Sequence, residues 1–340
     1  MWENLYYCSI LLCFCLFRLS ESTVPPKFTQ YLQETIGRDN LVVHLSRLGL
    51  ANRLRSIADW FNIATISRRF LIVIWDVTDD CKAGFHELFM ESQSLVVIDN
   101  YDGTTIEEIT ENFRQFSTIF KVLNGGSDTW TKGGNSFVLN RKAVMNDIPT
   151  LFSSYDGVLT MEGVSCQEYL NKHSKFLSNL EAVPSAASFA QSIYDEYFSN
   201  SIMVGVHYRA HDPQQDWAVV PPLLGDRTDK IFGEGASVDQ FTTIMGHIES
   251  SQNSQTLSDV GTPEGNHTAP TKKIRFFVAS NNLNAKTSIG AAFPSAIYLG
   301  GLHSRSEKSG MELALVEWLI LSKGALILHT YGSTFAEEAA

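Results

Sequence analysis

The most constraining feature of this sequence is a run of five apolar residues, Ile202–Val206, that leads directly into a cluster of polar side chains. The run is too short to cross a membrane and is rich in branched residues, which is typical of a strand buried on both faces. Strands of that kind belong to parallel sheets with helices on both sides. The polar residues after the strand therefore fall where α/β sheets bind their ligands.

This polar cluster contains residue types that can bind an anion and move a proton. His207 and Arg209 are two apart, so on an extended chain they point to the same side and can share one ligand. The planar fork of an arginine suits a phosphate, although an ion pair with a nearby carboxylate is the structural alternative. Asp212 and Asp216 are candidates for a general base; alternatively they are solvated loop charges or hold Arg209 in place.

The rest of the chain alternates between short apolar runs and helical patterns. Strands are predicted at 41–45, 70–75, 95–99, 137–139, 158–161, 274–279, 296–299 and 325–329, and helices at 52–68, 82–90, 106–120, 166–180, 186–198, 238–248 and 310–322, with a further helix that follows the strand at 274–279 and ends near 292. Two successive blocks of this alternation predict an α/β fold with two doubly wound domains, 28–198 and 199–340, and a cleft between them. Segment 249–273 has almost no apolar residues and predicts a mobile surface insertion.

Charge and missing motifs exclude several functional classes. A net charge of −11 argues against a general binder of nucleic acid or of anionic membranes. An anionic ligand therefore needs a local group of cations, which His207, Arg209 and the arginines at 47–55, Arg53 among them, can supply. The sequence has no D-x-D, HExxH, GxSxG or CxxC pattern, so no metal site is predicted.

The N-terminal region predicts entry into the secretory pathway. Residues 5–17 are apolar except for Ser9, and this length fits the core of a signal peptide better than a spanning helix. We expect a signal peptide in 1–24, with an uncleaved membrane anchor and a buried N-terminal element as alternatives. A glycosylation sequon at Asn266 agrees with this route. Cys81 and Cys166 allow one disulfide bond, which the sequence leaves open.

Two further loops have the pattern of anion cradles. In the loop His44–Arg55 a glycine follows a strand and precedes a helix, so that amides and the positive helix end can face an anion or a hydroxyl group. Within it Asn52 is either a ligand or a helix cap. The segment Tyr331–Phe335 follows the strand at 325–329 in the same way, and Ser333 there is either part of a cradle or an ordinary N-cap.

Taken in order, these segments resemble the fucosyltransferase superfamily, which includes protein O-fucosyltransferases and α1,6- and α1,2-fucosyltransferases. The matching segments are GLANRLRSIAD at 49–59, GVHYRAHD at 205–212, FFVASNN at 276–282 and VEWLILSKGALILHTYGSTFAEEA at 316–339. The resemblance implies a GT-B fold, with two Rossmann-like domains facing a cleft. It also implies an inverting, metal-independent transfer from the donor GDP-fucose, without a cofactor, to a protein or glycan acceptor in the lumen of the Golgi or endoplasmic reticulum.

The resemblance also implies roles for particular residues. It places His207 against guanine, Arg209 against the diphosphate, and Glu317 where the family usually has an aspartate that helps to hold the guanosine. Asn52 falls close to the transferred sugar or the acceptor, and Asp216 falls on an Asp-Trp pair of the protein O-fucosyltransferases. The family's turn near the diphosphate falls on Ser333, Thr334 and Phe335.

Departures from the family pattern leave room for a second function. Ala51 stands where a glycine is usual, Asn281 and Asn282 where aspartate is common, and Ala210 where a second arginine often follows. The first hypothesis is a fucosyltransferase in which Arg209 stabilises the departing diphosphate. The second is a non-catalytic protein that binds a nucleotide or a glycan on the same scaffold. A sulfotransferase-like enzyme is a distant third, because the strand–phosphate-loop–helix signature of that class is absent.

Overall fold

The computed structural model describes residues 41–91, 95–101, 120–123, 129–132, 135–138, 157–161, 176–209, 237–258, 272–301, 304–330 and 333–340. They belong to two compact units whose segments interleave along the chain. The first unit comprises Met1–His44, Ile63–Ile72 and Thr104–Val164, and the second comprises Leu45–Asn62, Val73–Gly103 and Ser165–Ala340. The predicted division into domains 28–198 and 199–340 stays a prediction.

Several predicted features lie outside the described residues. They are the signal or anchor in 1–24, the sequon at Asn266, the two candidate bases Asp212 and Asp216, and Cys166. The Sγ of Cys81 is buried and lies 3.8 Å from the carbonyl oxygen of Ala83, and its pairing with Cys166 stays a prediction. Among the helices that the structure describes, none is long and apolar enough to cross a membrane.

A mixed seven-stranded sheet has the order β3-β2-β1-β7-β4-β5-β6. Its strands are β1 (Leu41–Ser46), β2 (Phe70–Asp76), β3 (Val96–Asn100), β4 (Phe120–Leu123), β5 (Thr129–Lys132), β6 (Asn135–Val138) and β7 (Gly157–Met161). Helix α3 (Leu50–Ile66) connects β1 to β2, and the short helix α4 (Phe85–Leu88) precedes β3. In the first unit β4 pairs parallel to β7, whereas β4, β5 and β6 pair antiparallel, which the predicted doubly wound pattern did not include.

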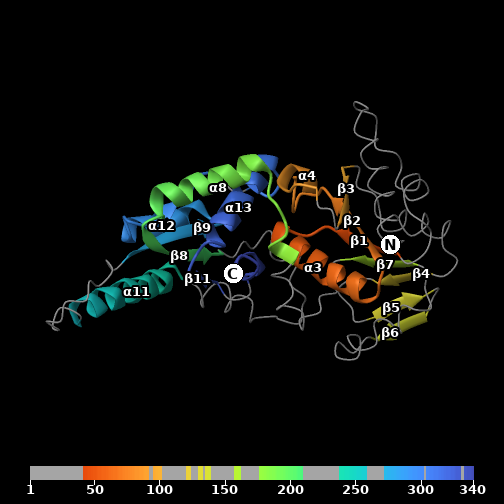
Figure 1. Ribbon diagram of the computed structural model, residues 1–340, viewed down its shortest axis with the longest axis horizontal. Helices are drawn as coiled ribbons and strands as arrows, with labels where there is room; N and C mark the ends of the chain where they lie inside the picture. The colour runs from red at the N-terminus through yellow and green to blue at the C-terminus, as the bar shows by residue number, and fades with distance from the viewer. Residues whose placement is uncertain are drawn as a thin grey trace, which may run out of the picture. The chain divides into compact units, whose positions relative to one another are not determined.

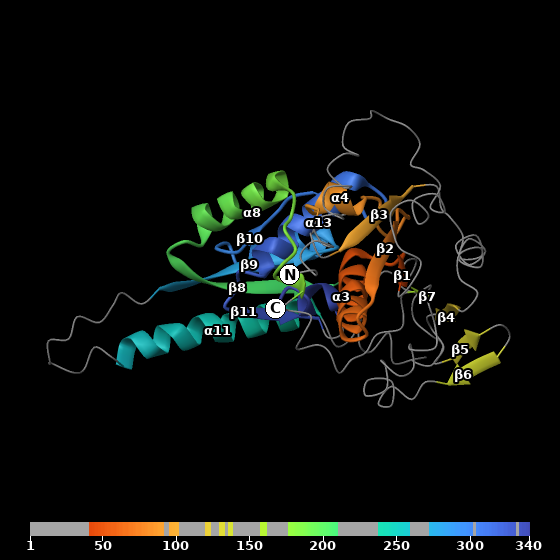
Figure 2. The ribbon, with the colours of Figure 1, turned by 45° about the vertical axis from the view of Figure 1, so that its right-hand side comes forward.

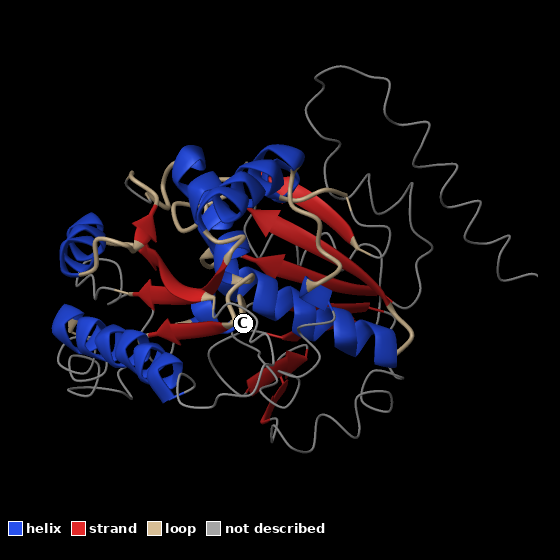
Figure 3. Ribbon diagram, turned by 60° about the vertical axis from the view of Figure 1, so that its left-hand side comes forward, coloured by secondary structure: helices blue, strands red, loops and turns tan. Residues whose placement is uncertain are grey.

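The second unit contains a four-stranded parallel sheet of order β10-β9-β8-β11. Its strands are β8 (Ser201–Tyr208), β9 (Lys273–Ser280), β10 (Ile297–Tyr298) and β11 (Leu326–His329). Its helices are α8 (Pro184–Tyr197), α11 (Val238–Ser258), α12 (Leu283–Ala292), α13 (Lys308–Leu321) and α14 (Thr334–Glu337), and they flank the strands (Figure 1, Figure 3). The prediction that Ile202–Val206 belongs to a parallel strand with buried side chains is confirmed, except that Ile202 itself is exposed.

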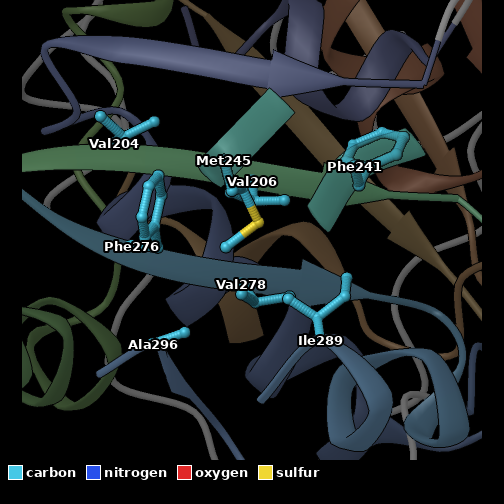
Figure 4. Close-up of a cluster of buried hydrophobic side chains, with 8 residues drawn as sticks. All are labelled: Val204, Val206, Phe241, Met245, Phe276, Val278, Ile289 and Ala296. Carbon is cyan, nitrogen blue, oxygen red and sulfur yellow. The ribbon is translucent and has the colours of Figure 1, made fainter. Parts of the chain in front are cut away.

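Alternate residues of β8 and β9 pack against different helices. The even-numbered residues face a core to which α11 and α12 contribute, formed by Val204, Val206, Phe241, Met245, Phe276, Val278, Ile289 and Ala296 (Figure 4). On the other face Phe277 meets Phe198 at the end of α8, with ring centroids 6.2 Å apart. Gly205 lets Leu321 of α13 approach, because a Cβ there would lie 2.9 Å from the Leu321 Cδ2. Helix α11 accordingly lies across β8 from α8 (Figure 1, Figure 2).

Two helices end where the sequence pattern did not predict. Helix α11 continues to Ser258, ten residues into the predicted insertion, since neither glycine nor proline occurs between Glu249 and Ser258. The Gln252 side chain on this extension accepts a hydrogen bond from the backbone N–H of Ile274 at 2.9 Å. Helix α4 is one turn long, because Phe89 turns into an extended conformation and pairs with Ala182 as a β-bridge.

Candidate functional site

The second unit contains a pocket at the carboxyl ends of its parallel strands. Its lining comes from the glycine loop before α3, the ends of β8 and β9, one face of α13 and the start of α14. The lining residues are Leu48, Gly49, Leu50, Ala51, Asn52, Asp80, His207, Arg209, Ser280, Asn281, Arg305, Gly310, Met311, Ala314, Glu317, Thr334 and Phe335. The structure therefore brings together the glycine loop, the H-x-R pattern and the turn before α14, which lie far apart in sequence.

At the end of β8, successive side chains point alternately into the pocket and into the core. His207 and Arg209 both line the pocket. Tyr208 between them points the other way and packs edge-on against Phe241, with ring centroids 5.4 Å apart, and burial raises the pKa of its phenol. The backbone N–H of Arg209 donates to the hydroxyl of Thr330 at 3.0 Å. The strand alternation predicted from the sequence thus sets an imidazole and a guanidinium on one side.

His207 is held by the turn that follows β11. Its Nδ1 is hydrogen-bonded to the Oγ of Ser333 at 3.0 Å, and its ring stacks on Phe335 with centroids 5.0 Å apart. Ser333 is the residue at the N-cap of α14, but its side chain makes no capping hydrogen bond. The hydroxyl of Ser333 therefore does not cap α14 but holds the imidazole of His207, and the neighbouring Thr334 and Phe335 line the pocket.

Two neighbouring candidate ligands after the glycine loop, Asn52 and Arg53, have different surroundings. Asn52, in the first turn of α3, lines the pocket, whereas Arg53 is fully buried and is not part of the lining. The Arg53 guanidinium lies 4.7 Å over the Trp75 ring. It donates to the carbonyl oxygens of Ser46 at 3.0 Å, Asp76 at 2.7 Å and Arg47 at 2.8 Å. The structure thus places Arg53 beneath the loop, where it holds the loop's backbone rather than a ligand.

One face of α13 forms a wall of the pocket. Gly310, Met311, Ala314 and Glu317 recur at helical spacing and all line it. Gly310 permits a close approach, because a Cβ there would lie 2.1 Å from the carbonyl oxygen of Ser304. Glu317, predicted from its position in the family pattern, is buried at the end of this apolar face.

Sequence reasoning missed two charged residues that line the pocket, Asp80 and Arg305, and one that supports it, Lys286. Asp80 and Arg305 lie in irregular segments, where no periodicity marks a residue as facing inward. Lys286 lies in the predicted helix that follows 274–279, at a position that composition alone assigns to solvent. Near Lys286, the sequence analysis singled out only Asn281 and Asn282, as departures from the family pattern. Asn281 lines the pocket, and Asn282 caps α12 by accepting a hydrogen bond from the N–H of Ala285.

Solved structures resemble this chain in fold, although they share little sequence identity with it. No protein-family model matches the sequence, and no curated protein matches it. NodZ α-1,6-fucosyltransferase co-crystallized with GDP matches with a TM-score of 0.52 at 13% identity, over 88% of this chain and 91% of that chain. NodZ from Bradyrhizobium matches with 0.51 at 13% identity, over 88% and 92%. POFUT1 in complex with GDP-fucose matches with 0.50 at 11% identity, over 89% and 94%.

This chain has the fold of these fucosyltransferases. The predicted α/β fold of GT-B type is thereby confirmed. In this fold the H-x-R pattern lies at the end of β8. The turn at Ser333 follows β11, and β11 pairs with β8 in the parallel sheet. Among the described residues no cluster of histidine, cysteine and acidic side chains could hold a metal ion.

Proposed function

We propose that this protein is a glycosyltransferase that moves fucose from GDP-fucose to a hydroxyl group of a protein or a glycan. The observation that carries the proposal is the pocket in which His207 and Arg209 meet Thr334 and Phe335 at the carboxyl ends of parallel strands. Further support comes from the fold, since solved structures that share it were determined with GDP or GDP-fucose.

The proposed reaction is a direct displacement at the anomeric carbon of fucose. The acceptor oxygen attacks this carbon while the bond to the β-phosphate oxygen breaks, so the configuration inverts and GDP leaves with the bonding electrons. Arg209 stabilises the negative charge that develops on the departing diphosphate. Asp216 or Asp212 takes the proton from the acceptor hydroxyl. On this proposal the protein residues supply the charge stabilisation and the reaction is independent of a metal ion.

The donor can be tested without knowing the acceptor. Thermal-shift assays with GDP, UDP, CMP and their sugars measure which nucleotide stabilises the protein, and we expect GDP and GDP-fucose to raise the melting temperature most. Stabilisation by UDP or CMP but not by GDP contradicts the proposed donor. Stabilisation by GDP without any release of fucose from GDP-fucose, in the presence of acceptor mixtures, assigns the chain to the non-catalytic alternative.

The role of Arg209 can be tested with a matched pair of variants. Arg209→Ala removes one of the cations that line the pocket, and we expect the rate of GDP release from GDP-fucose to fall by about 10²-fold or more. Arg275→Ala is the control, because Arg275 lies on β9 outside the pocket lining and donates to the carbonyl oxygen of Tyr197 at 2.9 Å. Near-normal turnover in Arg209→Ala overturns the assignment of this residue.

We also propose that the protein works in the lumen of the secretory pathway, in the Golgi or endoplasmic reticulum. The apolar N-terminal stretch and the sequon at Asn266 support this. Expression of the full chain in eukaryotic cells shows in which compartment the chain resides. The change in mass on deglycosylation shows whether the sequon at Asn266 carries a glycan. A chain that shows no shift in mass and stays in the cytosol contradicts the proposal.

A further inference from the structure

A buried ion pair borders the pocket, and its lysine has no part in the function proposed so far. The Nζ of Lys286 on α12 donates to the Oε1 of Glu317 on α13 at 2.6 Å and to the carbonyl oxygen of Leu299 at 3.2 Å. The exposed fraction of the side chain is 0% for Lys286 and 3% for Glu317. Both ions are thus removed from bulk water, while Glu317 also belongs to the pocket lining.

A buried ion pair of this kind adds little net stability to a fold. Removing two ions from water costs several kcal/mol for each ion, and apolar residues of similar volume often stabilise a fold equally well. The pair does have a function if the pocket needs a fixed negative charge at the position of Glu317. A carboxylate held by a lysine keeps its charge and its direction, whereas one that has lost its cation in a buried place takes up a proton or turns away.

The neighbours of Glu317 in the lining indicate what such an anion faces. Met311 and Ala314 form an apolar strip on the same face of α13, and the ring of Phe335 lines the pocket as well. Apolar and aromatic side chains of this kind suit the flat surface of a nucleobase. The carboxylate at the end of the strip accepts hydrogen bonds only, so it favours a base edge with adjacent N–H donors.

We propose that Lys286 is a positioning residue that holds the Glu317 carboxylate as an oriented anion and thereby sets which nucleobase the pocket accepts. This inference rests on the proposed function, because it takes the pocket to hold the nucleotide of the donor. Guanine presents a ring N–H beside an amino group, whereas adenine presents an amino group beside an acceptor nitrogen that a carboxylate repels. Lys286 acts through Glu317 and itself stays out of the lining.

The test measures the dissociation constants of GDP, ADP and pyrophosphate for the full chain by calorimetry. Pyrophosphate reports on the phosphate contacts alone, so it separates recognition of the base from general damage to the pocket. In Lys286→Met we expect GDP to bind about tenfold more weakly or worse, while pyrophosphate binding changes by less than about twofold. The preference for GDP over ADP should shrink by the same factor.

Two further variants show whether Lys286 acts through Glu317. Lys286→Met/Glu317→Gln should bind GDP as weakly as Glu317→Gln alone, because the two residues work as a unit. Lys286→Arg keeps the cation and should recover part of the preference for GDP over ADP. Lys308→Met is the matched control: Lys308 pairs with Glu87 at 2.8 Å on the exposed first turn of α13, and its loss should leave all three constants unchanged.

The outcomes separate this inference from the proposed function. If the wild-type chain binds no GDP, both are overturned. If it binds GDP and Lys286→Met keeps the same affinity and the same preference, the role of Lys286 alone is overturned. Equal losses for GDP and pyrophosphate assign Lys286 to the fold and also overturn its role. Should Lys286→Met fail to fold, a Glu317→Gln variant that still prefers GDP over ADP to the wild-type degree decides against the inference.

Discussion

Arg55 on α3 and Glu337 in the C-terminal helix α14 form an ion pair, with 2.7 Å between Nη2 and Oε2, although 282 residues separate them in sequence. Arg55 also pairs through its Nε with Glu338, whose side chain is only 4% exposed, against 38% for Glu337. Helix α3 brings Asn52 to the pocket and α14 brings Thr334. The Arg55 pairs therefore tie together two walls of one pocket.

Replacing Arg55 tests this connection. In Arg55→Met we expect the free energy of unfolding to fall by about 1–3 kcal/mol, because the Glu338 carboxylate is left buried without its cation. Urea unfolding measures the loss. Glu338→Gln should cost more than Glu337→Gln, which should stay under about 1 kcal/mol since its carboxylate is exposed. Equal costs for the two glutamates contradict this account of the contact.

Gly310 tests how tightly α13 packs beside the pocket. Gly310→Ala places a Cβ 2.1 Å from the carbonyl oxygen of Ser304, so backbone must shift. We expect a loss of about 1–3 kcal/mol in the free energy of unfolding, together with weaker nucleotide binding. Gly300→Ala is the control, because nothing lies within 4 Å of the Cβ it adds. An unchanged Gly310→Ala protein shows that the contact is not tight.

Ser333 tests whether the orientation of the imidazole matters for nucleotide binding. Ser333→Ala removes the hydroxyl from the Nδ1 of His207, and we expect GDP to bind about three- to tenfold more weakly, the loss of one hydrogen bond. Calorimetric titration measures the change. Ser192→Ala, which removes an exposed hydroxyl bonded to the carbonyl oxygen of Phe189 on α8, should leave binding unchanged. A Ser333→Ala chain with wild-type affinity rules out this orienting role.

His44 makes the protein sensitive to acid. Complete burial lowers the pKa of His44 from 6.5 to about 3, so the folded chain keeps this imidazole neutral. The unfolded chain takes up the proton below pH 6.5, and the stabilisation is therefore lost as the pH falls from 6.5 towards 3, by about 1.4 kcal/mol per pH unit. Urea midpoints at several pH values measure this slope. His44→Gln should have a shallower slope, and an identical slope would contradict the burial effect.

His86 has the opposite pH dependence. The hydrogen bond from its Nδ1 to Asp99, at 2.8 Å, raises its pKa above 6.5 although partial burial opposes this. Its stabilisation is fully present below pH 6.5 and is lost as the pH rises through the higher folded value. The effect stays under about 1 kcal/mol, because the side chain is 44% exposed. His86→Gln should remove the decline in melting temperature above pH 6.5, and a decline that persists points to another group.

The sequence predicted those features of the fold that depend on local patterns. An apolar run with branched residues marked β8 as a buried strand, and alternation along it placed His207 and Arg209 on one side. The end of α4 could not be predicted in this way, because Phe89 leaves the helix to pair with Ala182. The extension of α11 was missed for a different reason, since its polar composition hid a helix without breakers.

The sequence by itself determined the alternation of strands and helices in the second unit and the place of His207 and Arg209 at the end of β8, because the periods of strand and helix are properties of neighbouring residues. Tertiary structure alone decided that Lys286 meets Glu317, that Arg53 reaches the carbonyl oxygen of Asp76 and that Arg55 reaches Glu337. These pairs are separated by 23 to 282 positions, and which charges meet across such distances depends on how the helices and strands pack.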